Sequence, residues 1–293
     1  MNRLSIFGVF FLTVLLIGVG CDSVVQHNTE NNSELDAALS GKKAGPNALF
    51  NLDFNNASDA ADNNAGSAGW VVDRYAPETF GTTSFDGDNR LEINIDETGP
   101  TFGFYGYHGK KYMDADASHW TVGTNARFSY KFYIDPSWET DGVGQQTGVW
   151  PTLGDADGNI TAYPILEYQD SDANENSEAG FRAYVYLVDE DGNYTGADWV
   201  YIGIPKKLKI DPEAGGWVSV EAQLHKTNNG GVIKWRVNNN LVLDERDYNY
   251  LYGDVLYSST HFLEFIFNSA NFGVDQNYYY DDVILTDPGH AGK

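Results

Sequence analysis

The most constraining feature of this chain is the alternation of apolar and polar side chains along many short segments. In residues 217–225 every second position from Val218 to Leu224 is apolar, and the positions between are polar. Residues 126–134 and 232–237 alternate in the same way. A period of two places successive side chains on opposite sides of a strand. Each segment is therefore predicted to be a half-buried strand of an antiparallel sheet.

Clusters of Asp, Asn and Gly separate these segments at intervals typical of strands. They lie at residues 86–89, 155–159, 189–193 and 228–231. Such sequences favour the tight turns of β-hairpins. No stretch of a dozen residues has a convincing helical period, and we find no propeller or solenoid repeat. The sequence predicts one all-β domain, an antiparallel β-sandwich over residues 48–287, followed by a short tail, 288–293.

The first residues have the composition of an export signal. Arg3 precedes an apolar run at 6–17, and the small residues 18–20 lead to Cys21. A charged start, an apolar middle and a small-residue end are typical of a signal peptide. The run is shorter than the roughly 20 residues of a membrane-spanning helix. Residues 1–20 are therefore expected to be a signal peptide that exports the chain.

Cys21 is the single cysteine of the chain, so disulfides do not hold the predicted domain together. Its position after small residues resembles the lipobox of bacterial lipoproteins, in which the thiol is diacylated. Gly18 stands where that motif usually has Leu. The resemblance implies a lipid anchor on Cys21 at the cell envelope, with the outer membrane or cell surface favoured, and an ordinary secretion signal is the alternative. Residues 21–47 are polar and aperiodic, as expected of a flexible tether.

The charge of the chain excludes some partners. Eighteen basic residues face 42 acidic ones, giving a formal net charge of −24. A field of this sign repels phosphate backbones and anionic lipid headgroups. We therefore expect no nucleic-acid partner, and membrane contact only through the N-terminal lipid anchor. Most of the acidic residues are expected to keep the protein soluble, and a few to bind a divalent cation.

Three segments carry a family resemblance. They are the opening 49–54, the segment 216–221 followed by 231–242, and the closing 278–285. Together they are similar to the concanavalin A-like lectin and glucanase superfamily, the jelly-roll sandwiches that include laminin-G-like modules. The resemblance implies a jelly roll whose last strand returns beside the first. In several carbohydrate-binding sandwiches a structural Ca²⁺ ties these strands together, and the resembling positions here are Asp53 with Asp281 or Asp282.

Enzymes of this fold carry recognisable motifs. Laminarinase-like glycosidases have Glu-x-Asp-x-x-Glu or a close variant on one strand, which points two carboxylates into the cleft. In the nearest match, 165–172, Glu167 is present, but the second carboxylate is replaced by an amide, Gln169, and no second glutamate follows. Lyases of alginate-lyase type have an Arg- and Glu-containing strand and a Gln-x-His strand. Gln223 and His225 fit the second of these strands, but the strand that contains Arg127 lacks the glutamate.

A sugar-binding site requires aromatic rings for stacking and polar groups for the hydroxyls. In 181–186, Arg182 and Tyr184 share one strand face. If the strand that carries Glu167 lies beside it, the two form a polar and aromatic patch, or a solvated outer sheet. Trp150 and Trp199 are each at a strand edge next to polar turns, as the rim of such a patch would be. The candidate ligand-binding residues are His108, Trp150, Glu167, Gln169, Arg182, Tyr184 and Trp199, with His108 expected on a glycine-rich basic loop.

These observations favour an exported, lipid-anchored, non-catalytic β-sandwich that binds a polysaccharide or other glycan at a bacterial cell envelope. One alternative is a polysaccharide lyase, preferred over a glycoside hydrolase because paired carboxylates are missing. Another is a structural or adhesive surface protein without a small ligand. Apart from structural Ca²⁺, no cofactor is expected.

Overall fold

The computed structural model describes residues 48–60, 70–72, 77–95, 104–113, 125–154, 160–189, 194–227, 230–244, 262–270 and 272–286. Residue contacts divide the chain into Met1–Ser40 and Gly41–Lys293, and every described residue belongs to the second unit. The predicted signal peptide, Cys21, the whole of the predicted tether and the predicted tail lie outside the described residues. No helix in the described ranges is long and apolar enough to cross a membrane.

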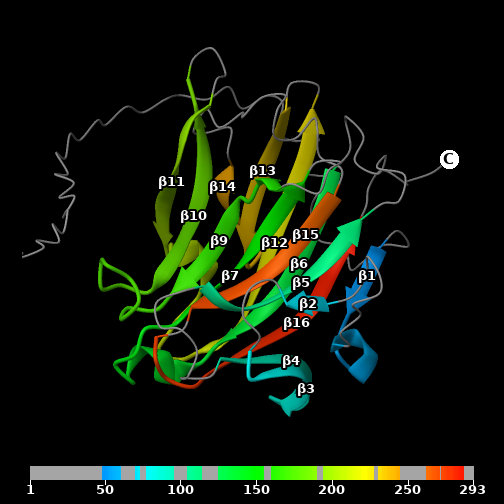
Figure 1. The fold of residues 1–293 in the computed structure, drawn as a ribbon. Helices are drawn as coiled ribbons and strands as arrows, with labels where there is room; N and C mark the ends of the chain where they lie inside the picture. Colours follow the sequence, from blue (N-terminus) through cyan, green and yellow to red (C-terminus); the bar gives the residue numbers. More distant parts are fainter. Residues whose placement is uncertain are drawn as a thin grey trace, which may run out of the picture. The chain divides into compact units, whose positions relative to one another are not determined.

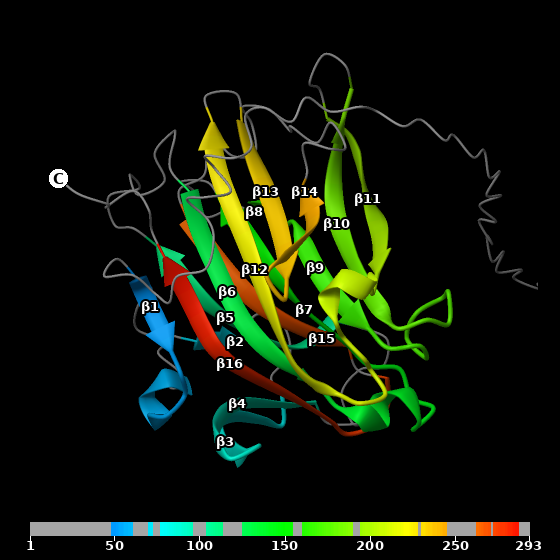
Figure 2. The same cartoon turned by 180° about the vertical axis from the view of Figure 1, so that it is seen from behind.

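Two antiparallel sheets, here named sheet A and sheet B, make up this part of the chain (Figure 1). Sheet A has the order β14 (Asn240–Asp244), β13 (Gly230–Val237), β12 (Gly216–Thr227), β6 (Asn125–Ile134), β16 (Gln276–Thr286), β4 (Asp88–Ile95) and β3 (Thr79–Phe85), and β1 (Ala48–Leu52) pairs with β16. Figure 2 looks onto this sheet from behind.

Sheet B has the order β11 (Tyr194–Gly203), β10 (Gly180–Val188), β9 (Ile165–Gln169), β7 (Gln146–Gly154), β15 (Phe262–Ala270), β5 (Phe104–Met113) and β2 (Trp70–Val72), and β8 (Ile160–Ala162) pairs with β7. The helical elements of the described ranges are short 3₁₀ turns, η1 (Ala57–Ala60), η2 (Pro136–Glu139) and η3 (Lys206–Leu208). The all-β antiparallel sandwich predicted from the alternation is thus confirmed.

The predicted strand faces are also those of the structure. On β12, Val218 and Leu224 and the apolar residues between them are buried in the core. Val220 pairs with Tyr130 of β6, another core residue, so the two strands point their apolar sides inward together. The polar residues between them, such as Ser219, therefore lie on the outer face of sheet A. Burial of these alternating apolar faces is the main force that holds the two layers together.

The core between the sheets is rich in aromatic residues. The largest fully buried side chains are Trp70, Trp235, Tyr168, Tyr278, Tyr280, Phe54, Phe128, Phe181, Phe267 and Leu91. One polar link crosses the core: Tyr280 of sheet A and Thr147 of sheet B share a hydrogen bond, and Ser269 donates to the Thr147 hydroxyl at 3.1 Å. Because each hydroxyl has a partner, this link satisfies polar groups that would otherwise destabilise a dry interior.

The last strand returns beside the first, as the resemblance implies. Leu52 of β1 is the register partner of Val283 of β16. Between Asp281 and Ile284 the strand contains one residue more than its partner β6, and Asp282 takes a positive φ of 48° there. This β-bulge lets Tyr280 and Val283, three residues apart, both point into the core.

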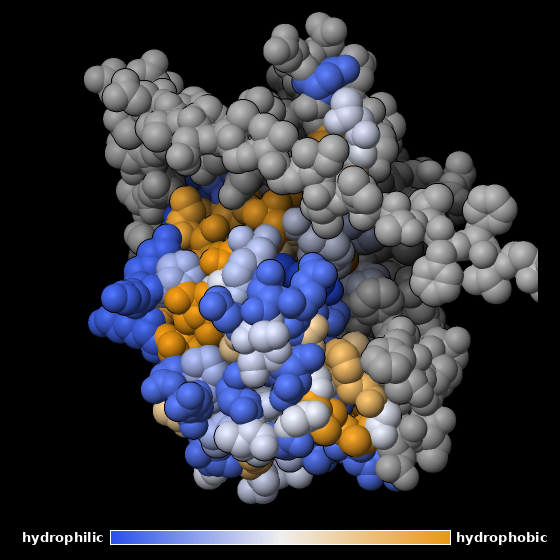
Figure 3. All heavy atoms as spheres, turned by 90° about the vertical axis from the view of Figure 1, so that its left-hand side faces the viewer, coloured by the Kyte–Doolittle hydropathy of each residue, from blue (hydrophilic) through white to orange (hydrophobic). Residues whose placement is uncertain are grey.

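The edge of sheet B that is formed by β11 carries both apolar and polar side chains. Val200 and Ile202 of this edge strand are partly buried and pack against the core. Seen from the side that carries β11, hydrophobic atoms reach the surface between hydrophilic ones (Figure 3).

Candidate functional site

The candidate site is built on the outer face of sheet B, where β7, β9, β10 and β11 lie side by side. Glu167 of β9 is the register partner of Arg182 of β10. The Arg182 Nε donates a hydrogen bond to the Glu167 carboxylate, and the two side chains form an ion pair. The predicted juxtaposition of these two strands, with both residues on one face, is thus present in the structure.

Glu167 is buried, with 2% of its surface exposed. Burial raises the pKa of its carboxyl group to about 7, and the Arg182 guanidinium opposes part of this rise by favouring the charged form. The Gln146 side chain hydrogen-bonds Glu167 as well. Gln169 donates from Nε2 to Oε1 of Gln146 at 3.0 Å. A carboxylate, a guanidinium and two side-chain amides are thereby held in one network.

A glycine on the neighbouring strand makes room for Glu167. Gly148 of β7 is its register partner. A Cβ atom added to Gly148 would lie 2.5 Å from the Glu167 Cβ and 2.6 Å from the carbonyl oxygen of Leu166. No real side chain tolerates such distances, so the close approach of the two strands requires glycine at position 148.

Aromatic side chains extend the site beyond this network, starting next to Arg182. The Arg182 guanidinium lies over the Trp199 ring, 4.1 Å from its centroid, which is cation–π geometry. Trp199 contacts Tyr184 at 5.2 Å between centroids, and Tyr184 lies nearly parallel to Tyr163 at 5.8 Å. Tyr163 in turn stacks with Trp150 at 5.9 Å. An aromatic row, defined here as Trp150, Tyr163, Tyr184 and Trp199, therefore crosses the sheet.

Exposure differs along the aromatic row. Trp150 is buried against Ile165, whereas Tyr184 and Trp199 are half-buried. Tyr163 is 39% exposed, among the most exposed large hydrophobic residues described. The prediction that Trp150 lies at the rim is therefore wrong. Its ring is buried over β9 and packs beneath the more exposed rings of the row. Trp199 is placed as predicted, beside Arg182.

His108 is not brought to this site. The glycine-rich segment predicted to be a loop is part of β5, where His108 pairs with Phe267 of β15 and Val72 of β2. The loop prediction is wrong because pairing on both sides outweighs the low strand preference of glycine. Two strands, β7 and β15, separate β5 from β9. The side chain of His108 lies outside what the structure describes.

The sequence reasoning missed three residues that shape the site, namely Tyr163, Gln146 and Gly148. Tyr163 precedes Pro164, and the residue before a proline is biased toward extended conformations, which was an available signal for an extended segment but not for the direction of the ring. Gln146 and Gly148 carried no comparable signal, because their roles depend on β9 lying beside β7.

The carboxylates predicted to bind Ca²⁺ each have another partner. Asp281 pairs with Arg90 at 3.0 Å, and Asp282 pairs with Lys131. The exposed Asp53 accepts a hydrogen bond from the Asn55 amide at 3.1 Å. Among the described residues, no group of three or more His, Cys, Asp and Glu side chains is arranged to hold a metal ion. The Ca²⁺ site stays a prediction.

The arrangement limits the chemistry that Glu167 can perform. Glycoside hydrolases of the usual kind need two carboxyl groups, one on each side of the scissile bond. Gln169, two residues further along the same face, is an amide that cannot act as nucleophile or acid. Glu167 itself is engaged by Arg182 and Gln146. Of this network Arg182 is the partly exposed member, so its guanidinium can donate to a hydroxyl beside the aromatic row, while Glu167, Gln146 and Gln169 are buried behind it.

The fold is similar to those of known proteins, although no family model matches the chain and no curated protein matches its sequence. An endo-1,3-beta-glucanase from Streptomyces sioyaensis has 12% identity and a TM-score of 0.52, covering 84% of this chain and 99% of its own. The catalytic domain of an endo-1,3-beta-glucanase (laminarinase) from Thermotoga petrophila has 12% identity and a TM-score of 0.45, covering 82% and 96%.

A polysaccharide lyase of family 7, an alginate lyase, has 13% identity and a TM-score of 0.44, covering 73% of this chain and 85% of its own. At such identities the likeness concerns the fold alone. This chain has the jelly-roll sandwich fold of the concanavalin A-like lectins and glucanases.

Proposed function

We propose that this protein is a non-catalytic carbohydrate-binding β-sandwich that holds a glycan on the outer face of sheet B. The observation that carries the proposal is the continuity of the aromatic row with the Glu167–Arg182 pair. Sugar rings stack their C–H faces on aromatic rings, and their hydroxyls need both donors and acceptors. The buried amides of Gln146 and Gln169 hold the Glu167–Arg182 pair in place from the same face.

Binding is preferred over hydrolysis because Gln169 replaces the second carboxylate. Lyase chemistry is disfavoured because the residues that it would use already have other partners. Arg127, which would neutralise a uronate carboxylate in a lyase, pairs with Glu221. Gln223 donates to the same carboxylate. Arg127 and Gln223 therefore both already bind Glu221. They also lie on sheet A, not on the sheet that carries the aromatic row.

The test is a glycan array followed by titration of the best-bound glycan into single variants. Tyr184→Ala and Trp199→Ala should each weaken binding by about tenfold or more, as expected for a buried aromatic contact. Thr195→Ala, an exposed position on the same strand as Trp199, is the matched control and should bind like the wild type. Unchanged affinity in both aromatic variants would overturn the proposal.

The same glycans also test for catalysis. New reducing ends that disappear in Glu167→Gln would establish a hydrolase. New ultraviolet-absorbing unsaturated ends on uronate polymers, lost in His225→Ala or His108→Ala, would establish a lyase. Absence of glycan binding together with absence of products would leave the structural or adhesive role.

The proposed location is the cell envelope, with the chain exported and lipid-anchored through Cys21. Support comes from the charged start, apolar run and small residues before the cysteine. Full-length protein expressed in a bacterium should incorporate radiolabelled palmitate, and Cys21→Ser should not. Secretion of an unlabelled wild-type protein would favour the ordinary secretion signal instead.

A further inference from the structure

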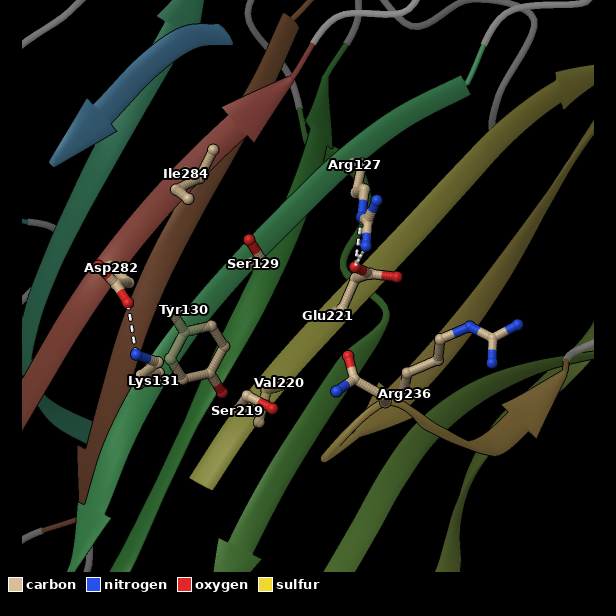
Figure 4. A pocket seen from close by; sticks show the side chains of 11 residues that line it. Arg127, Ser129, Tyr130, Lys131, Ser219, Val220, Glu221, Arg236, Asp282 and Ile284 are labelled. Carbon is tan, nitrogen blue, oxygen red and sulfur yellow. Dashed lines mark hydrogen bonds and ion pairs between the residues drawn. The ribbon is translucent and has the colours of Figure 1, made fainter. Parts of the chain in front are cut away.

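The outer face of sheet A differs from the site on sheet B in the side chains that it presents. It contains a pocket of about 390 Å³, whose charged lining residues are Arg127, Lys131, Arg236, Glu221 and Asp282 (Figure 4). Arg127 pairs with Glu221, and Lys131 pairs with Asp282. This pocket therefore presents charged groups, most of them paired with one another.

The outer face of sheet B presents exposed aromatic rings instead. In the part of the chain that the structure describes, the exposed large hydrophobic residues are Tyr163 and Tyr201, at 39% and 42% exposure. Tyr163 belongs to the aromatic row, whereas Tyr201 does not. Val200 and Ile202, the neighbours of Tyr201 on β11, pack against the core, so the side chain of Tyr201 points outward. Its register partner on β10 is Arg182, which lies on the same face.

Two glycines leave room for the Tyr201 ring on the surface of the sheet. A Cβ atom added to Gly180 of β10 would lie 3.0 Å from the Tyr201 hydroxyl oxygen. A Cβ atom added to Gly203 of β11 would lie 3.4 Å from Cε1 of the same ring. The ring therefore extends from its own strand over the outer side of both glycines. Its inner side contacts the sheet backbone, and its outer side faces solvent, which agrees with its exposure.

The loop between β9 and β10 fixes the position of the Tyr201 hydroxyl. The side chain of Asn174, which is buried, hydrogen-bonds this hydroxyl. Asn174 is itself held in place, because its Nδ2 donates to the Glu178 carbonyl oxygen at 2.6 Å and its Oδ1 accepts from the Asn176 amide at 3.0 Å. The orientation of the Tyr201 ring is thus set before a ligand binds, which lowers the entropic cost of binding.

Tyr163 and Tyr201 lie at the two ends of a path along β10. Tyr163 is level with Tyr186, because its amide donates to the Tyr186 hydroxyl at 2.8 Å. Tyr201 is level with Arg182. From Tyr186 to Arg182 the distance along the strand is about 13 Å at the usual rise. The Tyr184 ring and the Arg182 guanidinium lie on this path, so it offers an exposed ring at each end and a donor near Tyr201.

We propose that Tyr201 is a further stacking platform, and that the outer face of sheet B binds an internal stretch of a linear glycan chain along β10 and β11. This inference rests on the proposed function, because it names the ligand class of the same site. Tyr163 and Tyr201 stack two non-adjacent sugar units of one chain, and Arg182 donates to a hydroxyl of the units between them. A short oligosaccharide contacts one ring, and a longer one contacts both and binds more tightly.

The experiment measures affinity against the length of the oligosaccharide. The wild type is titrated calorimetrically with laminari-, cello-, xylo-, manno- and galacturonate oligosaccharides of two, four and six units. In at least one series, the hexasaccharide should bind about tenfold or more tightly than the disaccharide. Tyr201→Ala should weaken hexasaccharide binding by about tenfold and leave the disaccharide within about twofold of the wild type. A merely structural role for Tyr201 would not remove the dependence on length.

Tyr201→Phe is the matched control. It keeps the ring and removes only the hydrogen bond with Asn174, so hexasaccharide affinity should stay within about threefold of the wild type. Because the Tyr201 ring lies at the surface and outside the core, thermal melts of both variants should match the wild type closely. A loss of binding in Tyr201→Ala with an unchanged melt therefore reports on the contact with the sugar.

The inference is overturned if none of the five series binds, if disaccharide and hexasaccharide bind equally well, or if Tyr201→Ala either leaves hexasaccharide affinity unchanged or weakens every length alike. Failure of the proposed function has a different signature, because then no glycan of the array binds the wild type. If Tyr184→Ala and Trp199→Ala weaken binding and Tyr201→Ala does not, the proposed function stands and this inference alone is wrong.

Discussion

At the residue scale, the most informative position is Glu167. Its carboxyl group is buried beside Arg182, in space that Gly148 leaves open. Burial favours the neutral form and raises the pKa to about 7, above the 4.5 of an unfolded glutamate. The folded protein therefore binds a proton more readily than the unfolded chain between these two values.

This difference makes stability fall as pH rises. The contribution of protonated Glu167 to the free energy of unfolding is fully present below pH 4.5 and is lost as pH passes through about 7. This contribution is about 3 kcal/mol. Asp170, whose pKa burial also raises to about 7, acts in the same direction. Glu167→Gln should therefore lose less stability than the wild type between pH 4.5 and pH 7, measured by urea unfolding. Equal losses would show that Glu167 does not titrate in this window.

Gly148 can be tested separately. Gly148→Ala should lower the free energy of unfolding by about 1–3 kcal/mol, because the added methyl group overlaps the Glu167 backbone. Gly81→Ala on β3 is the matched control, since an added Cβ there meets nothing within 4 Å. Thermal and urea unfolding of both variants measure the difference in stability. A Gly148→Ala protein as stable as Gly81→Ala would mean that the two strands are further apart.

At the element scale, tight turns set the pairing of neighbouring strands. Between β13 and β14, Asn238 and Asn239 both have positive φ, 46° and 63°, as a type I′ turn requires. Asn238 accepts a hydrogen bond from the Ser219 amide at 3.0 Å and donates one to the Leu208 carbonyl at 3.0 Å. One side chain thus joins the turn to β12 and to η3.

Asn238→Ala should lower the free energy of unfolding by about 1–3 kcal/mol, because both hydrogen bonds are lost and alanine disfavours positive φ. Asn239→Gly should be neutral or slightly stabilising, since glycine adopts this φ freely. Urea unfolding of the two variants compares these neighbours directly. If both variants lose the same stability, the side-chain hydrogen bonds of Asn238 contribute nothing.

At the scale of the whole molecule, the net charge of −24 opposes compaction. Raising NaCl from 20 to 300 mM should therefore raise the melting temperature, because screening weakens the repulsion among carboxylates. The measurement is a thermal melt at constant pH. A melting temperature that falls or stays constant would show that the ion pairs outweigh the net repulsion. CaCl₂ at matched ionic strength should raise it further if Asp53, Asp281 and Asp282 bind Ca²⁺.

Much of the fold was predictable because it depends on local patterns. The alternation in 126–134 and 217–225 fixes which side of each strand is buried, and Asp86-Gly87 fixes a hairpin between β3 and β4. The shared face of Glu167 and Gln169 follows from the same period of two. His108 was misplaced in a loop because the glycines around it carry no information about the strands that pair with β5.

The sequence by itself determined that this is an all-β sandwich with apolar strand faces turned inward, because a period of two is a property of the chain alone. Only the tertiary structure decided that Gly148 lies across from Glu167, that Tyr163 joins the aromatic row, and that Arg127, Lys131 and Arg236 line one pocket. Those contacts join residues of different strands. They depend on the order of the strands in each sheet, which no local pattern encodes.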